Sequence, residues 1–364
     1  MKELKNIIDK YIHRSADEKM ALATVVRVEG SSYRRMGARM LVSENGTWVG
    51  GISGGCLEGD ALKRARMAIL KGKASIITYD TSTDDDHQIG VGLGCNGIID
   101  VLFMPIKADD TNPLNAITKT LDKTRKTHKL ITISKSSNEW LQGQILYFEG
   151  ADSLKILQNE CDVLGVAQLA EQLDKSKNLL VNDQLNLFIE VIPPALQILL
   201  FGHQYDLYPL IRQVAELGWH CKVIAQSSKV MSSELFEVIE PENMEKLQID
   251  QNTAAILMSH SLHTDKANLL KIKDWGLRYI GMLGPKVRSE RILNELKEEG
   301  VHLSEDALSR IFAPTGLDLG AANPEEISLS MVSEIKAVFA GRSAGHLRDR
   351  QVPINDRDKP MIFN

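Results

Sequence analysis

The sequence contains few cysteines, and they are widely spaced. Four occur among 364 residues, at Cys56, Cys95, Cys161 and Cys221. A disulfide framework or a structural zinc site needs cysteines at short spacings, and an iron–sulfur cluster needs a set of them. The spacing excludes these sites, and we expect free thiols in a reducing compartment.

Long apolar runs and a large net charge are also absent. No apolar segment approaches the roughly 20 residues that cross a bilayer. Residues 1–20 indicate a charged amphipathic helix rather than a signal peptide. The formal net charge of −5 gives no reason to expect a nucleic acid or an anionic membrane as a partner. We therefore expect a cytoplasmic protein.

Glycine is abundant around the first cysteine. Residues 50–58 read Gly-Gly-Ile-Ser-Gly-Gly-Cys-Leu-Glu, and the apolar spacing that follows predicts a helix over 57–71. Gly54 and Gly55 let backbone N–H groups approach a ligand. Cys56 falls at the start of the helix, where the helix dipole favours a thiolate or a bound anion. The alternative is a plain strand-to-helix turn with an inert, buried cysteine.

A second glycine loop surrounds the next cysteine. Gly92, Gly94 and Gly97 flank Cys95, and a strand-like run follows them. Two loops of this kind in one domain indicate one shared pocket for a small ligand. His87 follows three aspartates, and it is either a metal ligand or part of an acidic surface loop.

Residues 1–192 form the first expected domain, with an α+β or α/β fold. Helices are predicted at 57–71 and 112–127, and a polar helix-like segment covers 167–183. Strands are predicted at 21–29, 38–43, 74–79, 98–104, 130–134, 144–148 and 185–191. Pro193-Pro194 then punctuates the chain, and we place the domain boundary there.

Residues 193–341 show the alternation typical of a Rossmann-like, doubly wound parallel sheet, an α/β fold. Strands are predicted at 197–201, 220–225, 254–258 and 279–283, and helices at 208–217, 264–275, 287–299 and 324–340. Asn323 is the predicted N-cap of the last helix, and Gly341 its end. Residues 342–364 indicate a charged tail with little order.

The second domain lacks the usual dinucleotide fingerprint. A nicotinamide site needs Gly-x-Gly-x-x-Gly after the first strand and an acidic residue after the second. Here the bulky Gln204 follows Gly202, and Gln226 stands where the carboxylate is needed. We do not expect NAD(P) in its usual mode, and we interpret the domain as a scaffold for packing, dimerisation or another ligand.

Polar residues nevertheless follow several strands of this domain, where the crevice of a doubly wound sheet lies. The candidates for this second crevice are Gly202, His260, Asp265, Gly284 and Asp318. His260 is either a hydrogen-bonded structural histidine or a catalytic one. The helix at 287–299 begins among basic residues that either bind an anion or line a solvated face.

Six segments, taken in order, carry a family resemblance. They are 29–40, 54–58 and 92–97 in the first domain and 279–284, 314–320 and 323–327 in the second. In these segments the chain resembles the XdhC/CoxI family, accessory proteins for molybdenum hydroxylases such as xanthine dehydrogenase. The turn Gly202-His203-Gln204 and the pair Gln226-Ser227 depart from the family pattern, which has a glycine-rich turn and an Asp-Arg pair there.

The resemblance implies a carrier of the molybdenum cofactor, molybdopterin with its metal. Such proteins are understood to bind the cofactor, support its sulfuration with a cysteine desulfurase, and insert it into an apo molybdenum hydroxylase. A homodimer is implied as well. The phosphate of molybdopterin suits a glycine loop at a helix start, and the metal–sulfur end suits a thiolate.

The resemblance also implies roles for individual residues. Cys56 would contact the molybdenum or relay sulfur, and Cys95 would line the same pocket. Arg34 and Arg39 would meet the phosphate, unless they only solvate the surface. The cofactor-binding candidates are Ser31, Ser32, Arg34, Arg39, Gly54, Gly55, Cys56, Glu58, Gly94, Cys95 and Gly97.

Two other functions are compatible with the sequence. One is an NAD(P)-dependent oxidoreductase, which the doubly wound domain favours and its missing fingerprint opposes. The other is a docking chaperone that binds the apo-hydroxylase and no cofactor. We expect a non-enzymatic carrier, and the sequence does not identify its client hydroxylase.

Overall fold

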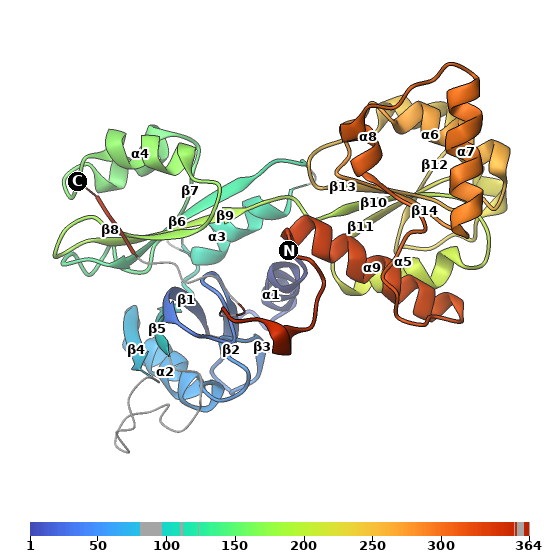
Figure 1. Cartoon of the computed structure of the whole chain (residues 1–364). Helices are drawn as coiled ribbons and strands as arrows, with labels where there is room; N and C mark the ends of the chain where they lie inside the picture. Colours follow the sequence, from blue (N-terminus) through green and yellow to red (C-terminus); the bar gives the residue numbers. More distant parts are fainter. Residues whose placement is uncertain (81–96, 110–111, 123, 353, 355–359, 364) are drawn as a thin grey trace. The chain divides into compact units, whose positions relative to one another are not determined.

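The computed structural model describes residues 1–80, 97–109, 112–122, 124–352, 354 and 360–363. The chain divides into two compact units (Figure 1). Unit 1 comprises Met1–Pro193 and Arg350–Asn364, and unit 2 comprises Pro194–Asp349. The first boundary falls within Pro193-Pro194, one residue from the position expected from the sequence.

Unit 1 contains two sheets. In the first sheet, antiparallel strands pair in the order β3 (Trp48–Gly50), β2 (Arg39–Ser43), β1 (Met20–Gly30), β5 (Gly97–Pro105) and β4 (Ser75–Asp80). In the second, the order is β16 (Met361–Ile362), β8 (Lys177–Leu180), β9 (Asn186–Ile192), β6 (His128–Lys135) and β7 (Ile145–Tyr147). Only the β16–β8 pair is parallel among the described strands of this unit. Of the two classes expected, unit 1 is therefore α+β.

Helices cover both faces of the first sheet. They and the other helices of unit 1 are α1 (Lys2–Ile12), α2 (Glu58–Lys71), α3 (Pro113–Thr118), η1 (Lys119–Leu121), η2 (Ala151–Leu157) and α4 (Val163–Gln172). Ala61, Ala65 and Ala68 of α2 pack on one face, and their small size brings the helix close to the strands. α1 and α3 share the core on the other face with the second sheet, whose outer face carries α4 and η2.

Unit 2 is built on one parallel sheet. Its strands pair in the order β12 (Glu237–Ile239), β11 (His220–Ile224), β10 (Gln197–Phe201), β13 (Thr253–Leu257), β14 (Tyr279–Met282) and β15 (Ile311–Phe312). The parallel pairing confirms the predicted doubly wound sheet. The strand order reverses between β10 and β13, the switch point at which such sheets form their ligand crevice.

Helices flank this sheet on two sides (Figure 1). They are α5 (Leu207–Glu216), η3 (Ser227–Lys229), η4 (Pro241–Lys246), α6 (Leu262–Ile272), α7 (Lys286–Glu298), α8 (Glu305–Ser309), α9 (Pro324–Ala340) and η5 (Leu347–Asp349). α5 and α9 share one core with the sheet, and α6 and α7 share the other. α9 has the predicted bounds, because the Asn323 side chain accepts the N–H of Glu326 at 2.9 Å and Gly341 takes the left-handed conformation.

Three expectations for the chain were wrong. The helix predicted at 112–127 stops earlier, since α3 and η1 end at Leu121 and β6 begins at His128. The segment 167–183 holds the end of α4 and strand β8, because Asp162 caps that helix further upstream. The tail is not one separate segment: Arg350–Asn364 belongs to unit 1, where β16 pairs with β8.

Within the described ranges, no helix combines the length and the apolar character needed to cross a membrane.

Candidate functional site

Three segments singled out in the sequence meet at one end of the first sheet, where β1 and β3 finish and β5 begins. β1 and β3 run in the same direction, and β5 starts beside the end of β1, where Gly30 pairs with Gly97. A Cβ added to Gly97 would lie 2.2 Å from the carbonyl oxygen of Ser31. A Cβ added to Gly54 would lie 3.2 Å from the ring of Tyr33. The loops after β1 and β3 therefore adjoin each other and the start of β5.

Part of the second glycine motif cannot be placed at this edge. Gly94 and Cys95 lie outside the described residues, as does His87. Gly97, the last glycine of the motif, is described and contacts the loop after β1. The expectation that Cys95 shares a pocket with Cys56 stays a prediction.

The Cys56 loop, residues 50–58, is held by two side chains. The Ser53 hydroxyl accepts hydrogen bonds from the N–H groups of Gly55 and Leu57, at 3.1 and 3.0 Å, on either side of Cys56. The Glu58 carboxylate accepts the N–H of Ser53 at 2.8 Å and also its hydroxyl. Because the N-cap residue Leu57 has no side-chain bond of its own, Ser53 takes over part of the capping at the start of α2.

Gly55 supplies the turn that presents the thiol. Its φ is +115°, a conformation that residues with a Cβ rarely adopt. No described atom lies within 4 Å of a Cβ added there. Gly54, Gly55 and Cys56 are all exposed, so the thiol faces solvent at the start of α2.

Cys56 differs in environment from the other described cysteines. Cys161 is half-buried, and burial raises the pKa of its thiol, with smaller contributions in the same direction from Asp162 and Glu160. Burial raises the pKa of Cys221 to about 12. Such thiols stay protonated at neutral pH and react slowly. Among the described cysteines, Cys56 is the one that a metal or a sulfur donor can reach.

Glu58 carries a negative charge beside the thiol. Burial alone would raise the pKa of Glu58, but hydrogen bonds from Ser53 and from backbone N–H groups outweigh burial and lower it. The carboxylate lies at the first residue of α2, where the helix dipole also favours an anion. Glu58 therefore holds the loop as an ionised group at neutral pH.

The structure corrects the role expected for Arg39. Its side chain is fully buried, and its terminal nitrogens lie 3.0 and 2.5 Å from the two carboxylate oxygens of Glu190. One nitrogen also donates to the carbonyl of Gly37 at 3.0 Å. The pair ties β2 of the first sheet to β9 of the second. Arg39 is thus part of the scaffold and is not available to a cofactor phosphate.

The remaining candidates on the loop after β1 differ in exposure. Arg34 is half-buried and forms an ion pair with Glu3 of α1. Ser31 is exposed, whereas Ser32 is almost completely buried. Ser31 and Arg34 therefore remain the accessible polar groups among these candidates.

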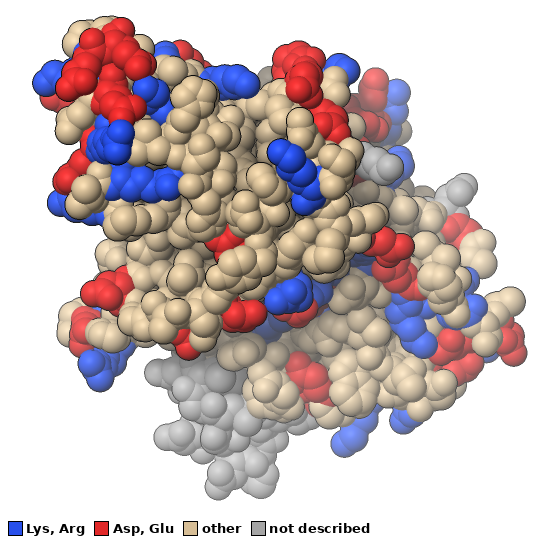
Figure 2. Space-filling model, turned by 90° about the vertical axis from the view of Figure 1, so that its right-hand side faces the viewer, with Lys and Arg blue, Asp and Glu red and all other residues tan. Residues whose placement is uncertain are grey.

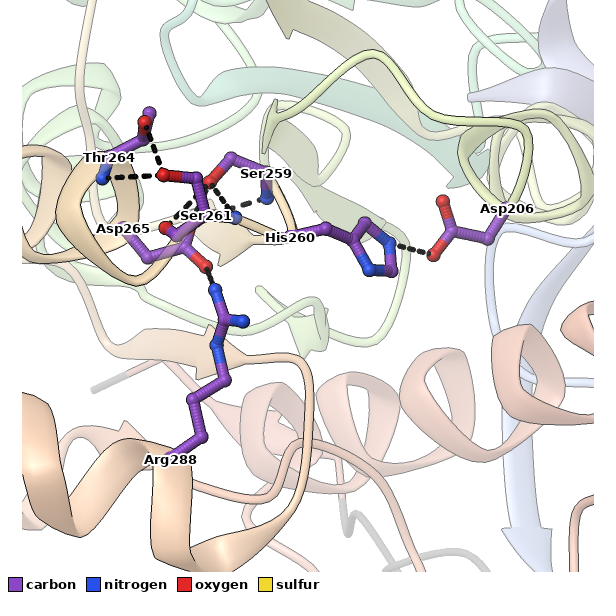
Figure 3. Close-up of polar contacts among 7 residues, drawn as sticks. All are labelled: Asp206, Ser259, His260, Ser261, Thr264, Asp265 and Arg288. Carbon is purple, nitrogen blue, oxygen red and sulfur yellow. Dashed lines mark hydrogen bonds and ion pairs between the residues drawn. The ribbon is translucent and has the colours of Figure 1, made fainter.

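Unit 2 places a histidine and a carboxylate across its switch point (Figure 3). Asp206 precedes α5, His260 follows β13, and His260 Nε2 lies 2.7 Å from Asp206 Oδ2. His260 has a φ of 60°, which costs a residue with a Cβ about 1–2 kcal/mol. The imidazole is half-exposed and already bonded within the unit.

Asp265 organises the same loop from a buried position (Figure 3). One carboxylate oxygen accepts the N–H and the hydroxyl of Ser259, at 3.1 and 2.6 Å. The other lies 2.6 Å from a guanidinium nitrogen of Arg288. Arg288 is therefore committed to Asp265 rather than open to an anion.

The other residues of the second crevice are only partly brought together. Gly202 lies against the residue that follows β13, since an added Cβ would be 2.5 Å from the carbonyl oxygen of Met258. Gly284 has a φ of +122° and lies against the Arg288 side chain. Asp318 is exposed on the loop before α9, and no hydrogen bond or ion pair joins it to His260 within the described part of the chain.

Two residues of these clusters were not singled out in the sequence. Ser53 lies five positions before Glu58 and was available as a capping residue, a signal that the glycines around it obscured. Asp206 directly precedes a helix, the usual place of an N-cap residue. Its pairing with His260 requires knowledge of which strands are neighbours.

Metal ligands mark no further site in the described residues, and charges of one sign do not gather on the face shown in Figure 2. Within them, no group of three or more His, Cys, Asp or Glu side chains is arranged to hold a metal ion. On the face shown in Figure 2, basic and acidic side chains are interspersed. Nucleic-acid-binding surfaces instead concentrate basic residues on one face.

Similarity to known proteins covers both units. The model of the XdhC and CoxI family matches residues 13–80, and that of the XdhC Rossmann domain matches residues 198–335. A Bacillus subtilis (strain 168) protein, named as a probable xanthine dehydrogenase subunit, is 30% identical over 326 residues, 87% of this chain and 92% of that protein. The molybdenum cofactor insertion chaperone PaoD of Escherichia coli (strain K12) is 23% identical over 317 residues, 87% of this chain and 82% of that protein.

A solved structure has the same fold over almost the whole chain. It is described as a xanthine dehydrogenase from Bacillus halodurans and is 25% identical in sequence. The match has a TM-score of 0.69 and covers 95% of this chain and 98% of that chain. On these matches, the chain belongs to the XdhC and CoxI family.

Proposed function

We propose that the protein binds the molybdenum cofactor at the Cys56 loop and inserts it into an apo molybdenum hydroxylase such as xanthine dehydrogenase. The names of two relatives support this, one a molybdenum cofactor insertion chaperone and the other a probable xanthine dehydrogenase subunit. The observation that carries the proposal is the exposed thiol of Cys56 on a glycine turn beside the loop after β1. The cofactor is cargo here, and the protein is a carrier.

The groups around Cys56 fit the chemistry of this cargo. A thiol is a soft ligand and suits the metal–sulfur end of the cofactor. The exposed backbone of Gly54 and Gly55 suits the polar edge of a pterin, whereas the carboxylate of Glu58 already takes the place of an anion at the start of α2. Arg34, on the adjoining loop, is paired with Glu3 and would have to exchange this partner for the phosphate. Ser53 and Glu58 keep the turn in one conformation.

Finer features of the proposal rest on the family resemblance. We propose that a cysteine desulfurase supplies sulfur to the bound cofactor, with Cys56 as the relay. We also propose that the protein acts as a homodimer in the cytoplasm. Cys95 would join Cys56 in the same pocket.

We further propose that unit 2 does not bind NAD(P) in the usual mode. Its strand order is that of dinucleotide-binding sheets, which favours an oxidoreductase. However, the pyrophosphate of such cofactors lies at the start of the first helix, and the carboxylate of Asp206 stands there in this chain. A titration with NADH, followed by its fluorescence, should show no saturable binding. Saturable binding with hydride transfer would favour the oxidoreductase instead.

Retention of the cofactor tests the main proposal. The wild-type protein, Cys56→Ala and Cys161→Ala are incubated anaerobically with molybdenum cofactor and desalted, and molybdenum and pterin are measured per chain. Cys161 is a matched control, because it is a half-buried cysteine of the same unit. We expect stoichiometric retention by the wild type and Cys161→Ala and its loss in Cys56→Ala. No retention by any of the three would favour a docking chaperone that binds no cofactor.

A further inference from the structure

A cavity of about 350 Å³ lies in unit 1, away from the Cys56 loop. It is lined by the turn between α2 and β4, the end of β5, and the loop between β6 and β7. Gly72 at its wall is the C-cap of α2, whereas Cys56 precedes the first residue of that helix. The helix has 14 residues, so about 21 Å of helix separates the two places. We call it the Trp140 cavity.

Part of the cavity lining is apolar and closely packed. It consists of Ala74, Met104 and Gly143 of the β6–β7 loop. A Cβ added to Gly143 would lie 2.8 Å from the Cβ of Ala74 and 3.2 Å from Met104 Cγ. The backbone of the loop therefore lies in close contact with the turn before β4 and with β5.

The indole of Trp140 lines the cavity and stays 60% exposed. Hydrogen bonds restrain the backbone of the loop that carries Trp140. The Asn138 side chain accepts the N–H of Trp140 at 3.1 Å, and the Gln144 side chain donates to its carbonyl at 3.0 Å. The next residue, Leu141, is buried. The backbone of Trp140 is thus held in place, and much of its large aromatic side chain stays uncovered and open to a ligand.

The charges at the cavity leave a positive excess. Lys73 and Glu139 line it and pair with each other at 2.5 Å, so their charges cancel. Lys107 also lines it, and we find no ion-pair partner for Lys107 among the residues that the structure describes. Gln142 adds a half-buried amide that can donate or accept a hydrogen bond.

We propose that the Trp140 cavity binds a small planar aromatic anion, with its ring on the indole of Trp140 and its acidic group toward Lys107. The volume lies within the range of small-molecule sites, which begins at about 300 Å³. The apolar part of the lining and the Trp140 side chain select a flat ring, and the uncompensated lysine selects an acidic substituent. This site is independent of the cofactor site proposed at Cys56.

Three probes of one shape and different charge test the proposal. They are 4-fluorobenzoate, 4-fluorobenzamide and 4-fluorobenzylamine, and their binding is followed by the ¹⁹F linewidth during titration with the full chain. We expect saturable binding in the order anion, neutral amide, cation. Binding that does not depend on probe charge, or no saturable binding of the anion, would overturn the proposal.

Variants locate the site. Trp140→Ala should weaken 4-fluorobenzoate binding about tenfold, because it removes the stacking face. Lys107→Ala should weaken it about two- to fivefold, because it removes an exposed charge partner. The controls are Trp48→Ala, which removes an indole that is 50% exposed on β3, and Lys63→Ala, which removes an exposed lysine of α2. Full binding in Trp140→Ala, or equal losses in the controls, would contradict this assignment.

Discussion

The Cys56 loop of unit 1 and the His260 loop of unit 2 use the same device at the start of a helix. In each, a carboxylate accepts both the N–H and the hydroxyl of one serine: Glu58 binds Ser53, and Asp265 binds Ser259. The residue that lies between the serine and the carboxylate in the sequence has a different environment in each loop. Cys56 is exposed at the surface, whereas His260 is bonded to Asp206.

The two loops therefore differ in what they leave open: the Cys56 side chain faces solvent, whereas the His260 side chain has a hydrogen-bond partner within its own unit. Glu58 bonds to Ser53 of its own loop, so the loop keeps its shape and leaves the thiol open. Asp265 is also tied to Arg288, and the His260 bond crosses the switch point. The same local device thus leaves a thiol open in one unit and closes a loop in the other.

The largest expected effect tests whether Arg39 belongs to the scaffold or to the open loop. Arg39→Ala leaves the carboxylate of Glu190 buried without its partner, which costs about 3–5 kcal/mol of unfolding free energy. Urea unfolding measures this loss. The double variant Arg39→Met, Glu190→Met should recover much of it, because it removes both charges. If Arg39→Ala leaves the stability unchanged but abolishes cofactor binding, Arg39 is a cofactor-binding residue and not part of the scaffold.

Asp265 tests how closed the unit 2 loop is. Asp265→Asn removes the charge that faces Arg288 and keeps the side-chain shape, and we expect a loss of about 2–3 kcal/mol in urea unfolding. Its counterpart Glu58→Gln should cost clearly less, because Glu58 is more exposed. Equal losses at the two positions would remove the contrast between the loops.

Glycine-to-alanine changes compare the space left in each region. Gly202→Ala places a methyl 2.5 Å from the Met258 carbonyl oxygen, and we expect a loss of about 1–3 kcal/mol. Gly59→Ala, one residue into α2 after Glu58, meets no described atom within 4 Å and should raise stability by about 0.5–1 kcal/mol. Both are read from urea midpoints. Destabilisation by Gly59→Ala would show that the surface near Cys56 is covered.

The smallest effect is a pH dependence at Glu58. Because its pKa is lowered on folding, the ionised carboxylate contributes stability above its unfolded-state pKa, and this contribution is lost as the pH falls through the folded-state pKa. Glu58→Gln should therefore be less stable than the wild type at neutral pH, and the two should converge as the pH falls below the folded-state pKa of Glu58. Glu149→Gln, the same change at an exposed glutamate of unit 1, serves as the control. A difference that grows toward acid pH would reverse the assigned sign.

Much of the fold could be predicted because it follows from local patterns. The alternation of short apolar strands and helices indicated the sheet of unit 2, and Asn323 and Gly341 marked both ends of α9. The glycine loop before α2 was likewise visible as a turn that ends in a cysteine. In each case, the deciding interactions lie within a few residues of one another.

What could not be predicted depends on partners distant in the sequence. The role of Arg39 depends on Glu190, which belongs to another sheet. The bond between His260 and Asp206 forms because β10 and β13 are neighbours in the sheet. This pairing cannot be read from the order of the strands along the chain. Strand β8 was missed because it is short and its partners, β9 and β16, come later in the chain.

Strand β16 makes unit 2 an insertion within unit 1. The chain leaves unit 1 at Pro193 and returns at Arg350, and Ile362 then pairs with Leu180 from a distant part of the sequence. Closing such a long loop has an entropic cost that grows with the length of flexible chain inside it. Once unit 2 has folded, much of that chain is no longer flexible, so its folding assists the docking of β16. Loosening the inserted unit should therefore release an edge strand of the unit that carries Cys56.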